Sequence, residues 1–331
     1  MKHSNIALFV AHIGCPNTCS FCNQHIISGK QETATAEDVG EAVKIARSHG
    51  TRGGQLAFFG GSFTAIDRAY MLELLNAANP FIKDGSISGI RISTRPDAID
   101  RAVIDILKAY GVASIELGAQ SMSDAVLKKN RRGHTAEDVR KASQLIKDYG
   151  FELGLQMMTG LYGDTDEGAI YTAEEIIKLR PATVRIYPTV VLEGTELDSL
   201  YRAGLYKPQT LDDAVSLCSK LLLMFYDANI DVIRMGLHSG GNVGEGYVAG
   251  AYHPAFRELC EGEIYLQKLL AAFAGKPNGN YKIFVSPKEI SKITGQKRKN
   301  IIKLKDTGYD CTVSPSENLE KYNFYIEEVK K

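Results

Sequence analysis

The chain has 331 residues, 44% of them hydrophobic, with 39 basic and 39 acidic side chains and a formal net charge of zero. This length suffices for one α/β barrel of roughly 200–250 residues plus a smaller subdomain, and the apolar content excludes a disordered chain. The balanced charge argues against a long polyanion as partner, because proteins that neutralise many phosphates usually carry a positive excess.

The N-terminal stretch MKHSNIALFVAHIG has a short apolar run and no A-x-A-like cleavage site, so it predicts a first strand and not a signal peptide. No segment approaches the roughly 18 consecutive apolar residues of a membrane span. Three of the six cysteines are clustered, which is not the pattern of a secreted disulfide framework. We therefore expect a cytoplasmic, reducing location without membrane association.

Apolar, β-branched-rich runs then alternate with helical patterns. The runs are IALFVAHIG (6–14), QLAFFGG (55–61), GIRISTRPD (89–97), SIELGAQS (114–121), FELGLQMMTG (151–160), TVRIYPTVV (183–191) and DVIRMGLH (231–238). Three helices are predicted to begin with a capping box, at 35–38, 135–138 and 210–213. This alternation predicts βαβ units and a parallel sheet. Because no GxGxxG follows the first strand, we predict an α/β fold of the partial (β/α)6 TIM-barrel type.

The alternation fades after residue 240, so we assign 1–240 to the barrel and 241–331 to a small C-terminal α+β cap. In the cap we predict a helix near 254–274, a strand at 281–285, a basic helical stretch at 286–306 and a last strand in YNFYIEEV. The run Lys297-Arg298-Lys299 could bind phosphate, although a solvated helix face is the simpler interpretation.

The stretch GCPNTCSFCNQ offers three cysteines, Cys15, Cys19 and Cys22, without a fourth nearby. Their spacing lets one loop hold three sulfurs around a small cluster. Three thiolates on a 4Fe–4S cube leave one iron without a protein ligand, and an open metal position usually receives a substrate. Two alternatives remain open, namely three structural cysteines or a zinc site completed by His12 or His25.

The pattern Cys15-x-x-x-Cys19-x-Phe21-Cys22 after a first strand resembles the signature of the radical S-adenosylmethionine superfamily. The resemblance implies that the open iron binds the amino and carboxylate groups of S-adenosylmethionine. It also implies reductive cleavage to a 5′-deoxyadenosyl radical that abstracts hydrogen from a substrate. An external one-electron reductant, of flavodoxin or ferredoxin type, is then the expected partner.

Other motifs extend the resemblance. Gly60-Gly61-Ser62 resembles the GGE-type turn at the methionine amino group, and ELGAQS resembles the E-x-G-x-Q-S strand end. The stretch 130–134 resembles an N-R-G-H motif, in which Arg132 would pair the methionine carboxylate, although a solvated arginine remains an alternative. The implied cosubstrate-binding residues are Phe21, Gly60, Gly61, Ser62, Ser93, Thr94, Arg95, Gln120, Arg132 and Gln156.

RIYPTVVLEGTEL followed by GLYKP resembles the elongator tRNA-modifying branch, with the oxygen-independent coproporphyrinogen-oxidase-like enzymes as the second similar branch. No acetyltransferase domain or basic N-terminal arm is expected. These two expected absences, together with the zero net charge, favour a small heterocyclic substrate. An example is a queuine-like 7-deazaguanine nucleobase that a lyase would cleave for salvage. Candidate substrate contacts are Asn23, Tyr187, Arg234 and His238. Elongator-like modification of a tRNA wobble uridine is the alternative, followed by a non-catalytic iron–sulfur electron-transfer protein.

Overall fold

The computed structural model describes residues 5–10, 15, 19–28, 32–50, 53–237 and 243–329. The chain packs into two compact units. The first comprises Met1–Thr210 and Phe225–Tyr252, and the second comprises Leu211–Met224 and His253–Lys331. The predicted boundary between barrel and cap, after residue 240, stays a prediction. No helix in the described part of the chain is both long and apolar enough to cross a membrane.

The first unit is built on a seven-stranded sheet in the order β1-β2-β3-β4-β5-β6-β8, and every neighbouring pair of strands is parallel. The strands are β1 (Asn5–Phe9), β2 (Gln55–Phe59), β3 (Gly89–Thr94), β4 (Val112–Gln120), β5 (Glu152–Thr159), β6 (Thr183–Pro188) and β8 (Asp231–Met235). All seven predicted runs therefore form strands, and the predicted α/β partial barrel is confirmed.

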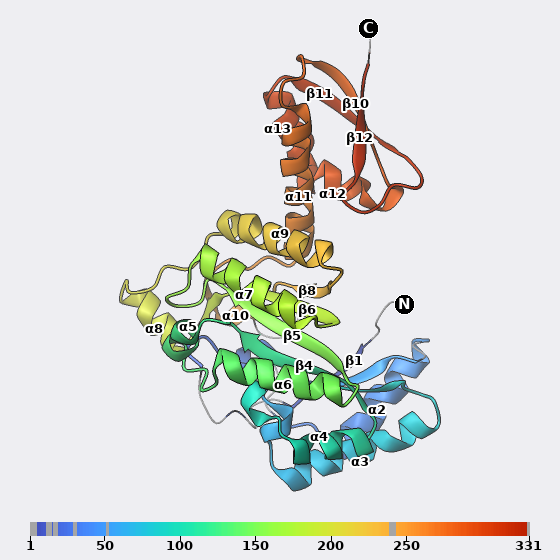
Figure 1. The fold of residues 1–331 in the computed structure, drawn as a ribbon, viewed down its shortest axis with the longest axis vertical. Helices are drawn as coiled ribbons and strands as arrows, with labels where there is room; N and C mark the ends of the chain where they lie inside the picture. Colours follow the sequence, from blue (N-terminus) through green and yellow to red (C-terminus); the bar gives the residue numbers. More distant parts are fainter. Residues whose placement is uncertain are drawn as a thin grey trace. The chain divides into compact units, whose positions relative to one another are not determined.

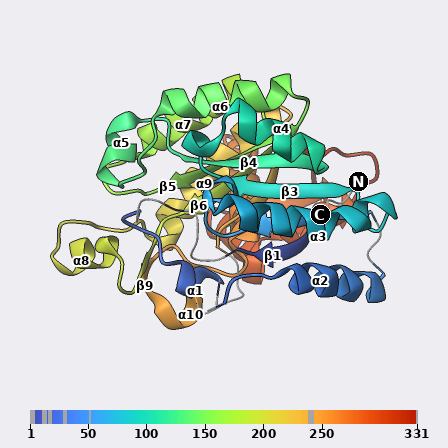
Figure 2. The ribbon, with the colours of Figure 1, turned by 90° about the horizontal axis from the view of Figure 1, so that it is seen from below.

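Helices follow the strands and cover one face of the curled sheet, as α6 does beside β4 and β5 and α2 beside β1 (Figures 1 and 2). The helical and remaining elements of the first unit are α1 (Gln24–Ser28), α2 (Ala36–Ser48), η1 (Phe63–Ala65), α3 (Arg68–Lys83), η2 (Pro96–Ala98), α4 (Arg101–Ala109), α5 (Asp124–Lys129), α6 (Ala136–Asp148), α7 (Asp166–Leu179), β7 (Val190–Leu192), α8 (Glu196–Arg202), α10 (Val243–Gly246) and β9 (Tyr247–Gly250). Helix α9 (Leu211–Asp227) lies mostly in the second unit.

Two of the predicted capping boxes are present. Thr35 and Thr135 each accept a hydrogen bond from the backbone N–H three residues later, and the aspartate at that position accepts from the threonine N–H. These reciprocal bonds satisfy two orphan donors of each helix and fix where the helix begins. Helix α9 begins at Leu211, directly after the third predicted threonine, Thr210.

The two faces of the sheet differ in polarity. Residues such as Ile92, Ile115 and Leu155 point to the helix-covered face and are buried. The alternate residues on the other face include Arg91 and Glu116, which are 0% and 1% exposed. Because successive strand residues alternate between faces, this pattern places a charged layer inside the curl of the sheet.

The second unit is α+β, as predicted, with a three-stranded sheet in the order β11-β10-β12. Its elements are α11 (Phe256–Phe273), β10 (Gly279–Val285), η3 (Pro287–Glu289), α12 (Ile290–Thr294), η4 (Gln296–Arg298), α13 (Lys299–Asp306), β11 (Tyr309–Pro315) and β12 (Phe324–Glu328). The predicted basic helical stretch is interrupted near Gly295, where φ is 77° and ψ 156°. The strand β11 was not predicted.

Candidate active site at the C-terminal edge of the sheet

The cysteine loop follows β1, at the edge where the parallel strands end. Cys15 is exposed, Cys22 is half-buried and Cys19 is buried, and all three are free thiols. The N–H of Cys22 donates to the Cys19 carbonyl at 3.1 Å, so the loop turns tightly between them. Burial and the neighbouring Cys19 raise the pKa of Cys22 to about 12. A metal or cluster would be required to hold this sulfur as a thiolate at neutral pH.

Ser20 fixes this loop to the segment after α5. Its hydroxyl donates to the side-chain carbonyl of Asn130 at 2.8 Å, and its N–H donates to the Asn130 backbone carbonyl at 3.3 Å. Its own carbonyl accepts from the N–H of Leu197 at 2.8 Å. Sequence reasoning missed this role of Ser20, since its position between two cysteines was the only local signal.

Arg132 lies against the cysteine loop. Its Nη1 donates to the sulfur of Cys19 at 3.1 Å, and its Nη2 donates to the carbonyl of Gly118 at 2.7 Å. Arg132 is 7% exposed, and its Nε bonds to none of the described residues. The contact places a buried positive charge directly beside the Cys19 sulfur.

Two further buried polar atoms at the same edge lack a partner among the described residues. They are Nη1 of Arg95, a residue only 3% exposed, and Oε1 of Gln120. The other side of the Arg95 guanidinium is held by Asp97, at 2.9 and 2.7 Å, and by the carbonyl of Arg132 at 2.6 Å. Since buried polar groups are normally paired, these atoms and Arg132 Nε fit a polar ligand at this edge.

The glycine turn after β2 takes the expected sharp shape, with φ of 83° at Gly60 and 38° at Gly61. Ser62 and Thr94 are brought together, but their hydroxyls bond to each other at 2.8 Å. The Ser62 hydroxyl also accepts from the N–H of Arg95 at 3.1 Å. These two predicted contacts therefore tie the ends of β2 and β3 together.

Gln156 and Ser93 join the charged layer below the edge. Gln156 Nε2 donates to Glu116 Oε2 at 3.0 Å and lies 3.4 Å from the Ser93 hydroxyl. Glu116 is also bonded by Arg185 at 2.6 and 2.9 Å and by Arg91 at 3.1 Å. Burial alone would raise the pKa of Glu116, but the hydrogen bonds and charges of the arginines outweigh it and hold that pKa below its usual value.

The described residues among the predicted substrate contacts have partners within the protein. The side chain of Asn23 donates to the Glu193 carbonyl at 3.1 Å, and Arg234 Nε donates to the Gly236 carbonyl at 3.2 Å. Tyr187 belongs to the charged layer, and burial raises the pKa of its hydroxyl. His238 and His12 lie outside the described residues, as does the side chain of His25.

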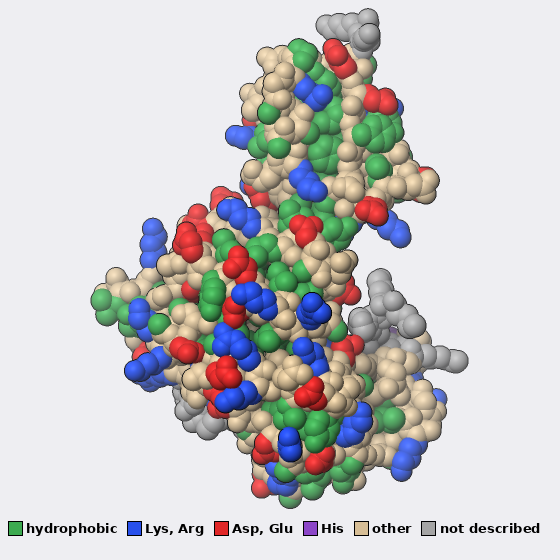
Figure 3. Space-filling view, viewed as in Figure 1, with side chains coloured by type: hydrophobic (Ala, Val, Ile, Leu, Met, Phe, Trp, Pro, Cys, Tyr) green, Lys and Arg blue, Asp and Glu red, His purple; other side chains and the backbone are tan. Residues whose placement is uncertain are grey.

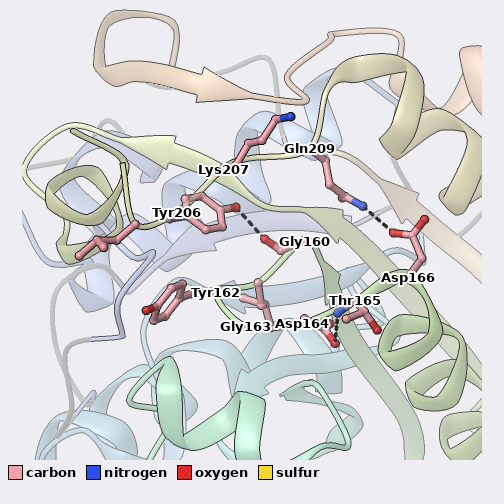
Figure 4. A pocket seen from close by; sticks show the side chains of 11 residues that line it. Gly160, Tyr162, Gly163, Asp164, Thr165, Asp166, Tyr206, Lys207 and Gln209 are labelled. Carbon is pink, nitrogen blue, oxygen red and sulfur yellow. Dashed lines mark hydrogen bonds between the residues drawn. The ribbon is translucent and has the colours of Figure 1, made fainter. Parts of the chain in front are cut away.

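Phe21 packs on an apolar cluster of Val191, Leu197 and Tyr206, together with Tyr162. The two tyrosines also line a pocket of about 330 Å³ beyond the end of β5 (Figure 4). In this pocket Tyr206 donates to the Gly160 carbonyl at 2.7 Å. Burial raises the pKa of Asp164, which also lines the pocket, to about 6. Sequence reasoning did not identify this pocket.

No three His, Cys, Asp or Glu side chains of the described ranges are placed to chelate a single metal ion. A 4Fe–4S cube binds each cysteine through a different iron, so its ligands need not meet at one ion. The Cys22 N–H bonds to the Cys19 carbonyl, and Arg132 bonds to the Cys19 sulfur. This donor set of thiols beside orphaned polar atoms fits a cluster with a polar cosubstrate.

Comparison with known proteins supports this chemistry. The chain is 32% identical over 191 residues, 52% of its length, to a tRNA uridine(34) acetyltransferase of Methanocaldococcus jannaschii, of which 35% is covered. It is 35% identical over 139 residues to elongator complex protein 3 of Dictyostelium discoideum, covering 41% of this chain and 25% of the relative. Both matches span well under two thirds of the relative.

Among solved structures, the archaeal Elp3 of Methanocaldococcus infernus superposes with a TM-score of 0.62 at 24% identity, over 80% of this chain and 63% of that one. This likeness shows the fold. The Radical SAM superfamily profile matches residues 10–176, and the Radical_SAM C-terminal domain profile matches residues 181–266. Members of this superfamily are enzymes that use a 4Fe–4S cluster and need a reductant. The chain belongs to the Radical SAM superfamily, and its cofactors are S-adenosylmethionine and a 4Fe–4S cluster.

Proposed function

We propose that this enzyme modifies a nucleobase of tRNA, with the wobble uridine as the first candidate. The observation that carries the proposal is the edge where Arg132 bonds to the sulfur of Cys19 beside the orphaned atoms of Arg95 and Gln120. The similar proteins that are named for tRNA uridine modification support the choice of substrate. The small heterocycle favoured by the zero net charge lacks such support.

Cys15, Cys19 and Cys22 are the proposed ligands of the cluster. When bound, the cluster and S-adenosylmethionine supply a 5′-deoxyadenosyl radical that can abstract hydrogen. Arg132 adds positive charge and a hydrogen bond at the Cys19 sulfur, a type of contact that tunes the reduction potential of iron–sulfur sites. Flavodoxin or ferredoxin remains the proposed source of the electron.

The cosubstrate is proposed to satisfy the polar atoms that the protein leaves unpaired. Arg132 Nε and Arg95 Nη1 are donors suited to a carboxylate, and Gln120 Oε1 is an acceptor suited to an ammonium or hydroxyl group. Both guanidinium groups are already fixed by other bonds, so little side-chain entropy is lost when they bind.

The charged layer gives the site its lower boundary. Glu116 is bonded on both oxygens, and its partners Arg91 and Arg185 are buried or nearly so. Arg91 and Arg185 both form ion pairs with Glu116, and Arg91 also pairs with Glu152. Neither arginine of this layer is left without a carboxylate partner. A substrate base is therefore proposed to enter from the C-terminal edge, where Tyr187 and Arg234 are the nearest candidate contacts.

The experiment is anaerobic incubation of reconstituted protein with reductant, S-adenosylmethionine and one candidate substrate at a time. The candidates are unmodified tRNA, the free nucleosides and free nucleobases, including a 7-deazaguanine. We expect tRNA to accelerate 5′-deoxyadenosine formation and to carry a base of altered mass. Acceleration by a free nucleobase, with tRNA inert, would restore the small-molecule function.

A further inference from the structure

The second unit contains a groove of about 640 Å³ that the radical chemistry does not use. It lies among the first turns of α9, helix α11, the loop after α12, and helix α13. Figure 1 shows α11, α12 and α13 grouped on one side of the small sheet. Its apolar wall is formed by Leu211, Val215, Leu259, Leu266 and Ile302. Ile302 is 53% exposed, so the apolar wall of the groove is open to solvent at this residue.

The loop at one end of the groove has the sequence Gly295-Gln296-Lys297-Arg298. Gly295 adopts φ 77° and ψ 156°, a conformation open almost only to glycine. Lys297 and Arg298 both have positive φ, 52° and 62°. Lys297 and Arg298 thus adopt a left-handed backbone conformation that is unfavourable for residues with a side chain.

Contacts with α11 fix this loop. The side-chain amide of Asn300 donates to the carbonyls of Gly262 and Ile293, at 2.8 and 3.1 Å, and Asn300 is 3% exposed. A side chain on Gly295 would come within 2.8 Å of Asn300 Cγ, so only glycine permits this approach. These contacts therefore fix the backbone of the loop and the positions from which its exposed side chains extend.

The loop and its flanks concentrate positive charge. Residues 290–306 contain six basic side chains and one acidic side chain, a net charge of +5 in a chain whose total is zero. Lys292 is neutralised by Glu289 and Glu261, at 2.7 and 3.2 Å. By contrast Lys297, Arg298 and Lys303 are exposed, and the exposed Lys299 lies 3.8 Å from Asp212. In the face of the first unit seen in Figure 3, basic and acidic side chains are interspersed.

The chain order here is strand β10, helix α12, the four-residue loop, helix α13 and strand β11, with β10 and β11 parallel. A glycine-containing four-residue loop between two helices is the device by which KH-type modules clamp backbone nucleotides of single-stranded RNA. Here Arg298 takes the place of the second glycine and keeps a left-handed conformation that suits a glycine.

We propose that this groove binds a single-stranded segment of RNA. The phosphates lie on the Gly295–Arg298 loop and the first turn of α13, and the bases lie on the apolar wall. The groove is also lined by Asp212, Glu258, Glu263 and Asp306, whose oxygens can accept hydrogen bonds from exocyclic amino groups of bases. The choice of RNA as ligand rests on the proposed function.

The test uses the full-length protein and a fluorescein-labelled 12-nucleotide RNA of mixed, unpaired sequence, followed by anisotropy at about 50 and about 200 mM salt. The variant reverses two exposed charges, Lys297→Glu with Arg298→Glu. The matched control reverses two exposed lysines of the same unit outside the groove, Lys220→Glu with Lys276→Glu. Thermal unfolding verifies that both variants fold.

We expect the loop variant to bind the RNA at least about tenfold more weakly, with a salt slope smaller by about two, and the control to stay within about threefold. Cleavage of S-adenosylmethionine without RNA should be unchanged in both. Equal losses in both variants would overturn the proposal. So would a preference for duplex RNA over the single strand, or binding of anionic lipid vesicles that RNA does not displace.

Failure of this site and failure of the proposed function are distinguishable. Single-stranded RNA that binds through the loop, while no tRNA base changes mass, would contradict only the proposed reaction. A tRNA base that changes mass equally well with the loop variant, at tRNA concentrations below saturation, would contradict only the RNA site.

Discussion

The cysteine edge of the first unit and the basic loop of the second unit present positive charge in opposite ways. Arg95 and Arg132 are 3% and 7% exposed and are fixed by hydrogen bonds to neighbouring residues. Lys297 and Arg298 are exposed on a fixed backbone. Buried, oriented cations suit one small ligand of defined geometry, whereas exposed cations suit a polyanion whose phosphates vary in position.

Because the exposed cations of the second unit are clustered, the total charge of the chain is a poor guide to its partners. The zero net charge argued against tRNA, yet residues 290–306 carry +5. Binding depends on the local field, because charges more than about 10 Å apart are largely screened at physiological salt.

Cys19→Ala should abolish the cluster, because it removes the buried sulfur that Arg132 contacts. Anaerobic reconstitution should give about four irons per chain in the wild type and a small fraction of that in the variant. Cys311→Ala is the matched control, since Cys311 is a buried free cysteine of the second unit. Equal iron loss from both variants would show that unfolding, and not ligand removal, is measured.

Glu116→Gln should lower the free energy of unfolding by about 3–5 kcal/mol at pH 7, because Arg185 would lose the carboxylate that pairs with it and Arg91 would keep only Glu152, at 2.6 Å. The folded-state pKa of Glu116 is depressed, so its contribution is present above its unfolded value of about 4.3 and is lost as pH falls through the folded pKa.

The control for Glu116 is Glu175→Gln, which removes a carboxylate whose two partners, Arg140 and Lys178 at 2.7 and 2.6 Å, are exposed. Urea unfolding should show a loss below about 1 kcal/mol for this variant, since exposed pairs contribute little. A similar loss of unfolding free energy in both variants would contradict the larger contribution of Glu116 to stability.

Arg132→Ala should weaken S-adenosylmethionine binding about ten- to hundredfold, the range for one charge-assisted hydrogen bond, while the iron content stays near that of the wild type. Arg131→Ala is the neighbouring control, because Arg131 is 63% exposed and pairs with Glu196 at 2.7 Å. Calorimetric titration measures the affinity of both variants for S-adenosylmethionine. Unchanged affinity in Arg132→Ala would move the carboxylate contact to Arg95.

Asp164→Asn should raise the free energy of unfolding by about 1 kcal/mol at pH 8, a value reduced for the partial solvent exposure of the site. The folded-state pKa of Asp164 is raised to about 6, so the wild type loses stability as pH rises through that value. The gain should therefore vanish toward pH 4. Asp105→Asn, at an exposed helix position, is the control and is measured over the same pH range.

The strands and helix starts could be predicted because their causes are local. The seven apolar runs form strands, and Thr35 and Thr135 cap helices through residues three positions away. The helix break at Gly295 was missed because its cause lies in Gly262 and Asn300, which are brought to it by packing. Strand β11 was missed because its exposed residues alternate without a strong apolar pattern.

At the candidate site, motif resemblance located the C-terminal edge of the sheet but not the hydrogen bonds among its residues. Arg132 was expected to face a carboxylate, and the structure adds a bond to the Cys19 sulfur that spans 113 residues of sequence. Ser62 and Thr94 stay predicted cosubstrate contacts, and the structure adds a hydrogen bond between their hydroxyls. Such pairings depend on the register of β2 and β3, which no single motif contains.

The central claim is that the first unit performs the radical chemistry while the second unit holds the RNA. The most direct measurement compares 5′-deoxyadenosine formation by the wild type and by the double variant Lys297→Glu, Arg298→Glu, with and without tRNA. Without tRNA the two rates should be equal. At tRNA concentrations below saturation, stimulation of the variant should fall at least about tenfold and recover at saturating tRNA. Equal stimulation of both proteins at every tRNA concentration would contradict this division of function.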